Sequence, residues 1–254
     1  MMCTLCFQSY FVSKNIVLSI VDLNRFSDIR DIVDEKFVAI CEGRSGTDLQ
    51  TVKKRVFNLF KTKGETWIQG AVAEFFVHLY LNTLGLKQEC LFFNLEENSI
   101  KKGFDGFYSD KNKKSWIMES KSGSMTSKRI SHASKALEAM RDLENKVSGK
   151  DAEINPWRNA YSHASHIDVG SSKSIRDRLR DLSNDYTNGI YYQIEDFNTI
   201  PCGTIYLKGV WNSYSHDKIL KDIKKYKNRL KGNSIHVICV TNKTVDDFIS
   251  YISS

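Results

Sequence analysis

The amino-acid sequence predicts an α/β protein with a central mixed β-sheet flanked by helices. Its 254 residues are 41% hydrophobic and 26% charged, with only two prolines, which is the composition of a folded globular chain. Segments with helical periodicity alternate along the chain with short apolar segments typical of strands. One long apolar helix precedes three predicted strands and a second helix, an order that favours a mixed sheet covered by helices.

The N-terminal part of the chain is predicted to contain one strand and two helices. Residues 16–23 (IVLSIVDL) are apolar and largely β-branched, as expected of a strand. Apolar residues recur at helical spacing through residues 26–41 and again through 48–61. The residues between these helices, 43–47, are interpreted as a loop in which Thr47 could cap the second helix.

The middle of the chain is predicted to hold the longest helix and three consecutive strands. Residues 66–84 form the most apolar predicted helix, and Gly85 follows where a C-terminal cap is expected. The strands are bounded by polar or glycine residues, as strands in soluble proteins commonly are. The expected ranges are 89–95, 103–108 and 115–121 for the strands and 126–147 for the helix that follows.

The C-terminal part is predicted to alternate shorter elements after a polar, irregular stretch at residues 151–172. The sequence is therefore divided into an N-terminal α/β segment, residues 1–63, which packs on the core or binds a partner, and a core domain, residues 64–254. The remaining elements expected are helices at 174–182, 217–230 and 245–252 and strands at 189–194, 203–210 and 234–241.

The charge balance favours a polyanionic partner. Lys and Arg number 37 against 30 Asp and Glu, a formal net charge of +7 that suits nucleic acid better than an acidic protein. Neither a secretory signal nor a membrane span is recognised, so the chain is expected to be cytoplasmic, without a membrane partner. Its six cysteines are then expected to stay reduced, and the Cys3/Cys6 pair lacks a second pair to complete a zinc site.

The segment from Gly103 to Gly123 (GFDGFYSDKNKKSWIMESKSG) contains the residues that point most directly to chemistry. We interpret it as two strands joined by a polar turn. In the second strand Glu119 and Lys121 are two residues apart and therefore share one face. An antiparallel hairpin places Asp105 opposite residue 118 or 119. Two carboxylates and an amine are therefore expected to converge.

Carboxylates paired in this way predict a metal site. Asp105 and Glu119 would repel one another unless a cation lay between them, and hard divalent cations such as Mg²⁺ prefer oxygen ligands. A metal ion makes its bound water a better nucleophile, and the ion and the Lys121 ammonium can together stabilise charge that develops on a phosphodiester. The donor set thus predicts phosphodiester hydrolysis.

An acid on the long apolar helix, Glu74, extends this set. Most residues on its helical face are apolar, and a buried carboxylate needs a partner such as a metal, a water or Lys121. Glu65 competes for this role, but the helix dipole already explains an acid in the first turn. His78, one turn after Glu74, is interpreted as a core histidine with satisfied hydrogen bonds.

The order of these motifs resembles that of the PD-(D/E)XK nuclease superfamily. Glu74 lies on a helix, Asp105 follows a Gly-Phe pair, and Glu119 and Lys121 form a Glu-x-Lys on the next strand. Phe104 stands where the superfamily's name has proline. The helix GAVAEFFVHLYL and the strands KGFDGFY and WIMESKSG are also similar to the nuclease subunit of Hachiman antiphage defence systems, over Gly70 to Gly123.

The resemblance implies a restriction-endonuclease-like core and an effector endonuclease that cleaves DNA with Mg²⁺, or alternatively Mn²⁺, beside a helicase-like partner. By the same resemblance Asp105 and Glu119 would be metal ligands, with the backbone carbonyl of Ser120 completing the shell. Lys121 would position the attacking water or stabilise the transition state. Glu74 would be the helix acid.

Basic residues directly after the second strand are candidates for contacts with nucleic acid. Lys128, Arg129 and Lys135 could hold phosphates on either side of the scissile bond, without reading the base sequence. The lysine-rich segment 218–231 is equally well explained as a solvated helix face. His163 and His166 lack acids or cysteines at metal-ligand spacing and are interpreted as surface-loop residues.

Two other functions remain open. A catalytically silent nucleic-acid-binding or scaffolding subunit could have the same fold, although it would not need Asp105, Glu119 and Lys121 together. A hydrolase of small phosphate compounds is disfavoured because the chain lacks a glycine-rich phosphate loop: residues 43–46 (GRSG) have neither the lysine nor the strand-before-helix context.

Overall fold

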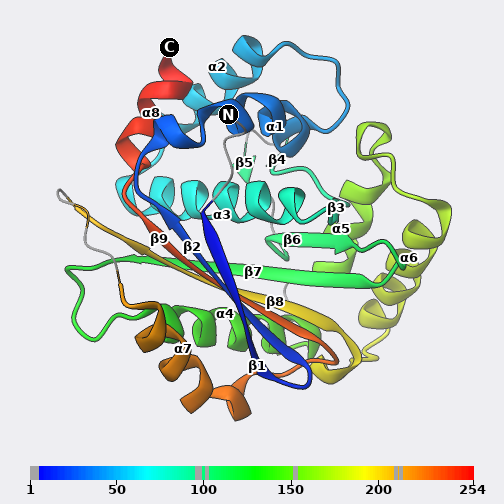
Figure 1. Ribbon diagram of the computed structural model, residues 1–254. Coiled ribbons are helices and arrows are strands. Elements are labelled where there is room, and N and C mark those ends of the chain that lie inside the picture. Colours follow the sequence, from blue (N-terminus) through cyan, green and yellow to red (C-terminus); the bar gives the residue numbers. More distant parts are fainter. Residues whose placement is uncertain (1–5, 95–98, 101–102, 151–153, 209–210, 212–213) are drawn as a thin grey trace.

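The computed structural model is an α/β fold in which helices cover both faces of a seven-stranded mixed sheet (Figure 1), as the sequence predicts. The structure describes residues 6–94, 99–100, 103–150, 154–208, 211 and 214–254. No helix in these ranges is both long and apolar enough to cross a membrane.

The main sheet is built around four parallel strands with antiparallel strands at both edges. The strand bounds are β1 Phe7–Ser13, β2 Ile16–Leu23, β3 Lys87–Gln88, β4 Phe93–Asn94, β5 Ser99–Ile100, β6 Gly106–Ser109, β7 Ser115–Ser124, β8 Asn198–Tyr206 and β9 Ile235–Asn242. The order in the main sheet is β1-β2-β9-β8-β7-β6-β3, and β4 pairs only with β5. Strands β2, β9, β8 and β7 are parallel.

The helices form two layers around this sheet. Their bounds are α1 Arg30–Glu42, α2 Leu49–Phe60, α3 Glu65–Thr83, α4 His132–Val147, α5 Pro156–Ser165, α6 Lys173–Thr187, α7 His216–Lys225 and α8 Val245–Ser253. Short 3-10 helices are η1 Phe26–Asp28, η2 Ile167–Val169, η3 Ile194–Asp196 and η4 Lys227–Arg229. In Figure 1, α1, α2, α3 and α8 lie above the sheet, and α4 and α7 lie below it.

Each face of the sheet has its own buried cluster. Phe37, Phe75 and Phe248 from α1, α3 and α8 belong to one cluster, together with the inward residues of the sheet. Leu143 of α4 and Trp157 of α5 belong to the other. Burial of such large apolar side chains is the main favourable term in folding.

The first 63 residues take part in this sheet and core. Strand β2 pairs with β9 along its whole length, from Ile16 opposite Ile235 to Leu23 opposite Asn242. Helix α1 packs against α2 and α3, and α2 packs against α8. The division of the chain after residue 63 stays a prediction of the sequence.

Two predicted strands are wrong. Residues 189–193 are irregular and Ile194 begins η3, because Ile190 and Tyr191 are exposed rather than turned into a core. The predicted strand 89–95 is also absent as one element. The chain leaves the sheet after β3, where the buried Glu89 accepts hydrogen bonds from the Ser109 and Ser171 hydroxyls, and residue 95 lies outside the described ranges.

Three predictions that concern helices also need correction. The predicted loop 151–172 contains α5, whose N-terminus is capped by the Asn155 side chain and has Pro156 at its first turn. The predicted helix 126–147 begins only at His132, because Ser131 forms a capping box with Ser134. At the start of α2 the capping residue is Asp48, which accepts a hydrogen bond from the Thr51 amide, and not Thr47.

Candidate active site

Strands β6 and β7 form the hairpin that carries the predicted site residues. Gly106 pairs with Met118, so the next pair, just beyond the end of β6, is Asp105 and Glu119. Ile117 and Met118 lie in opposite hydrophobic clusters, which places Glu119 and Lys121 on the α4 face of β7 together with Ile117. Both the register and the face agree with the sequence interpretation.

Pairing of β6 with β7 begins at Gly106, where there is little room for a side chain. A Cβ atom at Gly106 would lie 2.5 Å from the Tyr108 ring and 2.8 Å from Met118 Cε. Strand β7 continues beyond this point, where its edge no longer pairs with the backbone of β6. The Asp105 side chain binds this edge instead, because its Oδ2 accepts a hydrogen bond from the Ser120 amide at 2.8 Å. Since the N–H and C=O of one strand residue point to the same side, the Ser120 carbonyl faces this edge as well.

Helix α4 and strand β7 are linked by a chain of alternating charges. The Glu119 side chain is buried, and its Oε1 accepts from Lys121 Nζ at 3.0 Å while its Oε2 accepts from Lys146 Nζ at 2.5 Å. Lys121 Nζ also lies 2.7 Å from Asp142 Oδ2. Lys146 Nζ also donates to the Gly103 carbonyl at 2.6 Å. Each charged side chain in this series therefore lies next to a group of opposite charge, which offsets part of the cost of burying it.

The site shifts the pKa of its charged groups. Burial, and then the charge of Asp105, raise the pKa of Glu119 to about 7, despite two ammonium groups beside it. Burial, and then the charge of Glu74, raise the pKa of Asp105 to about 6. Burial lowers the pKa of Lys121, but Glu119 and Asp142 outweigh this effect and hold that pKa above its usual value. Lys121 therefore stays protonated.

Glu74 reaches toward the hairpin from α3. Its side chain is buried, and its Oε1 lies 3.3 Å from His78 Nε2. His78 Nδ1 is hydrogen-bonded to the Tyr108 hydroxyl of β6, so His78 is a core histidine with partners, as expected. Glu65, in contrast, lies in the first turn of α3 and contacts Gln69 and Lys208. Of these two acids, Glu74 is the one whose charge acts on Asp105.

The donor set fits a hard divalent cation. Asp105 and Glu119 offer carboxylates, and Ser120 offers a backbone carbonyl at the same strand edge. Each carboxylate oxygen of Glu119 already lies next to a lysine ammonium, Lys121 at Oε1 and Lys146 at Oε2. In the described ranges no three Asp, Glu, His or Cys side chains gather into one metal-binding group. The candidate ligands are two side-chain carboxylates and one backbone carbonyl.

A basic hollow lies next to the hairpin. Lys128, Arg129 and Lys135 line one hollow of about 460 Å³ between the end of β7 and the start of α4. Lys128 and Arg129 are exposed, whereas Lys135 is paired with Glu138 at 2.9 Å. Arg129 has a φ of 59°, an uncommon conformation for a residue other than glycine. The structure brings the three predicted basic residues together.

Asp142 and Lys146 are site residues that the sequence interpretation missed. They follow Lys135 and Glu138 along α4 at helical spacing and so extend one polar stripe from the basic hollow to Glu119. That stripe was the only available signal, and a solvated helix face has the same pattern.

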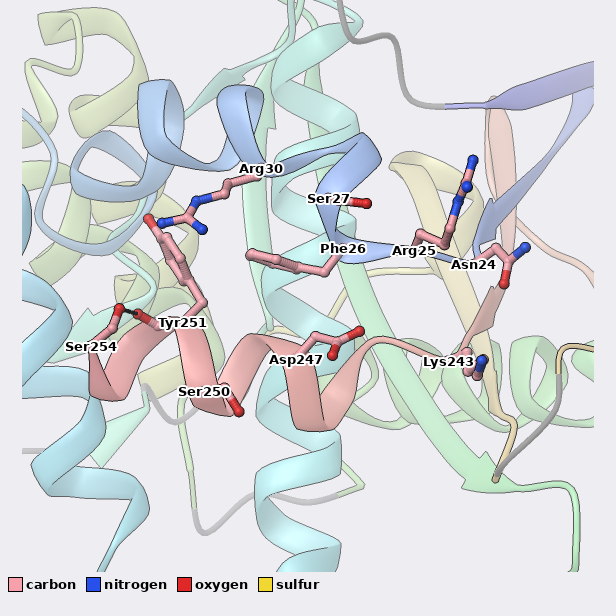
Figure 2. Close-up of a pocket in the computed structure, with 10 residues that line it drawn as sticks. All are labelled: Asn24, Arg25, Phe26, Ser27, Arg30, Lys243, Asp247, Ser250, Tyr251 and Ser254. Carbon is pink, nitrogen blue, oxygen red and sulfur yellow. Dashed lines mark hydrogen bonds between the residues drawn. The ribbon is translucent and has the colours of Figure 1, made fainter.

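A second hollow, of about 530 Å³, lies between η1 and α8, where β2 and β9 end (Figure 2). Arg25, Arg30 and Lys243 are among the residues lining it. Arg25 Nε lies 3.0 Å from Asp28, and Arg30 Nε lies 3.9 Å from Asp34. None of the predicted site residues lines this hollow.

The other chemistry-bearing residues lie elsewhere. His163 lies on α5 and its Nδ1 accepts a hydrogen bond from the Leu91 amide at 3.3 Å, so its interpretation as a loop residue is wrong. His166 is exposed at the C-terminus of α5. Cys6 is a free, exposed thiol, and Cys3 lies outside the described residues.

Comparison with protein-family models identifies the family of the chain. No curated protein matches the chain. A family model described as HamA matches residues 14–254, which include the hairpin, α3, α4 and most of the N-terminal segment. The chain therefore belongs to the HamA family, a component of Hachiman antiphage defence systems.

Proposed function

We propose that this protein is a metal-dependent nuclease that hydrolyses DNA phosphodiester bonds as the effector of its defence system. The observation that supports this most strongly is the convergence of Asp105, Glu119 and Lys121 beyond the end of β6. A hairpin with a purely structural role does not need two enclosed carboxylates side by side, because like charges and burial both raise the free energy of the folded state.

In this proposal Asp105, Glu119 and the Ser120 carbonyl would hold Mg²⁺ or Mn²⁺. The ion would supply Lewis-acid polarisation of the scissile phosphate and a lowered pKa for water. Lys121 stays charged between Glu119 and Asp142, so its ammonium can stabilise negative charge that develops on a phosphate oxygen. Asp142 would hold Lys121 in place, and Glu74 would be the helix acid whose charge acts on Asp105.

The basic hollow supports nucleic acid as the substrate. Lys128 and Arg129 are exposed and adjacent to the strand that carries Lys121, so they can contact phosphates flanking the scissile bond. Such contacts hold the backbone and do not read bases. The resemblance to Hachiman nuclease subunits further suggests a helicase-like protein as the partner of this nuclease.

The test is a cleavage assay with purified protein on linear and supercoiled DNA, with Mg²⁺ and with EDTA. We expect Glu119→Gln and Lys121→Met to lower the cleavage rate by about 100-fold or more, as removal of transition-state stabilisation commonly does. Glu35→Gln and Lys54→Met, at exposed positions on α1 and α2, make the same charge changes and should leave the rate unchanged.

Equal cleavage by the wild type, Glu119→Gln and Lys121→Met would refute the assigned site. DNA binding without any cleavage, even with a helicase partner present, would refute the nuclease and favour the catalytically silent binding subunit.

A further inference from the structure

We propose that Lys146 is a built-in counter-cation, which neutralises Glu119 in the metal-free protein and gives way when a divalent cation binds. This inference rests on the proposed function, because it concerns the metal that Asp105 and Glu119 would hold. It assigns a role to a residue on α4, outside the motifs that the sequence singles out.

The Lys146 ammonium contacts two oxygen atoms of the kinds that also bind metal ions. Its Nζ lies 2.5 Å from Glu119 Oε2 and 2.6 Å from the Gly103 carbonyl oxygen. One carboxylate and one backbone carbonyl are the ligand types that Mg²⁺ and Mn²⁺ prefer. The ammonium therefore uses an oxygen that a metal at this carboxylate pair would need.

The second lysine of the site is held differently. Lys121 contacts both Glu119 and Asp142, so Asp142 keeps it in place when Glu119 turns to another cation. For Lys146, Glu119 is the one carboxylate at ion-pair distance within the described part of the chain, although the Lys146 charge also acts on Asp105. Lys146 lies in the last turn of α4 with 21% of its side chain exposed, so its flexible stem can carry the ammonium to solvent.

The charge balance gives the direction of the effect. With Lys146 in contact, Glu119 has two ammonium neighbours, and an arriving divalent cation meets repulsion from both. Metal binding must therefore release Lys146, and the cost of that release lowers the affinity for metal. Below a certain concentration of metal ion, the Lys146 ammonium therefore stays bound to Glu119 in place of the metal.

The experiment measures metal binding in the absence of DNA. Mn²⁺ and Mg²⁺ are titrated calorimetrically into the wild type, Lys146→Met, Lys146→Gln and Lys146→Arg. We expect Lys146→Met and Lys146→Gln to bind Mn²⁺ about tenfold more tightly, because a competing positive charge at a partly buried carboxylate is removed. Lys146→Arg keeps the charge and should stay near the wild-type affinity.

Two controls isolate the competition. Lys150→Met makes the same charge change at an exposed position four residues later and should leave the affinity unchanged. In a Glu119→Gln background the Lys146→Met substitution should no longer tighten binding, because the carboxylate that both cations share is gone. Circular dichroism tests whether each variant is folded. If Lys146→Met does not fold, Lys146→Gln serves in its place, because its amide can still donate a hydrogen bond to the Gly103 carbonyl.

The outcomes separate this inference from the proposed function. Unchanged or weaker Mn²⁺ binding by Lys146→Met and Lys146→Gln would overturn the counter-cation role, and so would tightening by Lys146→Arg as large as that by Lys146→Met. If the wild type binds Mn²⁺ and Glu119→Gln does not, the proposed metal site stands in either case. If neither the wild type nor any Lys146 variant binds metal, the proposed function fails together with the inference.

Discussion

The distance between α4 and the sheet is set at Gly203 of β8. A Cβ atom at this position would lie 2.4 Å from the backbone oxygen of His132 and 2.9 Å from the backbone nitrogen of Ala136. These are atoms of the first turns of α4, and a backbone cannot rotate away as a side chain can. We predict that Gly203→Ala forces α4 outward from β8 and strains the helix that carries Asp142 and Lys146.

The magnitude follows from the closeness of these contacts. Overpacking a well-packed interior costs about 1–3 kcal/mol, and contacts with two backbone atoms place Gly203→Ala in the upper half of that range. For a domain of this size each kcal/mol corresponds to about 2–4 °C in melting temperature, so we expect a fall of roughly 4–12 °C. Urea unfolding and differential scanning calorimetry of the metal-free protein measure both quantities.

A second glycine provides the control. Gly70 lies within α3, and a Cβ atom there meets no heavy atom within 4 Å. Gly70→Ala should therefore stabilise the protein by about 0.5–1 kcal/mol, because alanine is the better helix former. A Gly203→Ala protein that melts with the wild type, while Gly70→Ala melts higher, would refute the close approach of α4 to β8.

The remaining predictions concern pH and salt. The pKa of Glu119 is about 7 in the folded protein against 4.5 ordinarily, so the folded state binds more protons than the unfolded chain between these values. Its contribution to stability in EDTA should therefore fall as pH rises from about 4.5 to 7, and urea titrations of Glu119→Gln should lack this part of the pH dependence. Because bound ligands must be deprotonated, calorimetric Mn²⁺ affinity should rise with pH between about 5.5 and 8; a flat profile would contradict the ligand assignment. For the basic hollow, Lys128→Ala with Arg129→Ala should weaken DNA binding in fluorescence anisotropy and reduce the salt slope by about 2, and an unchanged slope would exclude both residues from phosphate contact.

The hairpin and the long helix could be predicted from the sequence because their signals are local. Alternation along β7 places Glu119 and Lys121 on one face, and the polar turn fixes the register that brings Asp105 opposite Glu119. The apolar run of α3 similarly makes Glu74 conspicuous as a buried acid. Each of these inferences needs only residues that are neighbours in one element or in one hairpin.

Elements without a local signal were missed. Strand β1 is an edge strand with Phe11 largely exposed, so it lacks the alternation that marks a half-buried strand. Helix α5 lies in a polar segment and is held by the burial of Trp157 and Ala160 against other elements. Lys146 was missed for a related reason: only the packing of α4 on β7 makes one lysine of a charged helix the partner of Glu119.

The strand order also determines when the main sheet can be completed. Strand β9 lies between β2 and β8, although β2 belongs to the first and β9 to the last part of the sequence. Contacts between residues so distant in sequence form slowly, since the closure of a long loop must precede them. During synthesis the hairpin and α4 leave the ribosome well before β9, so the sheet behind Glu119 is incomplete until nearly all of this sequence has emerged. A chain that ends before β9 therefore lacks the strand that joins β2 to β8.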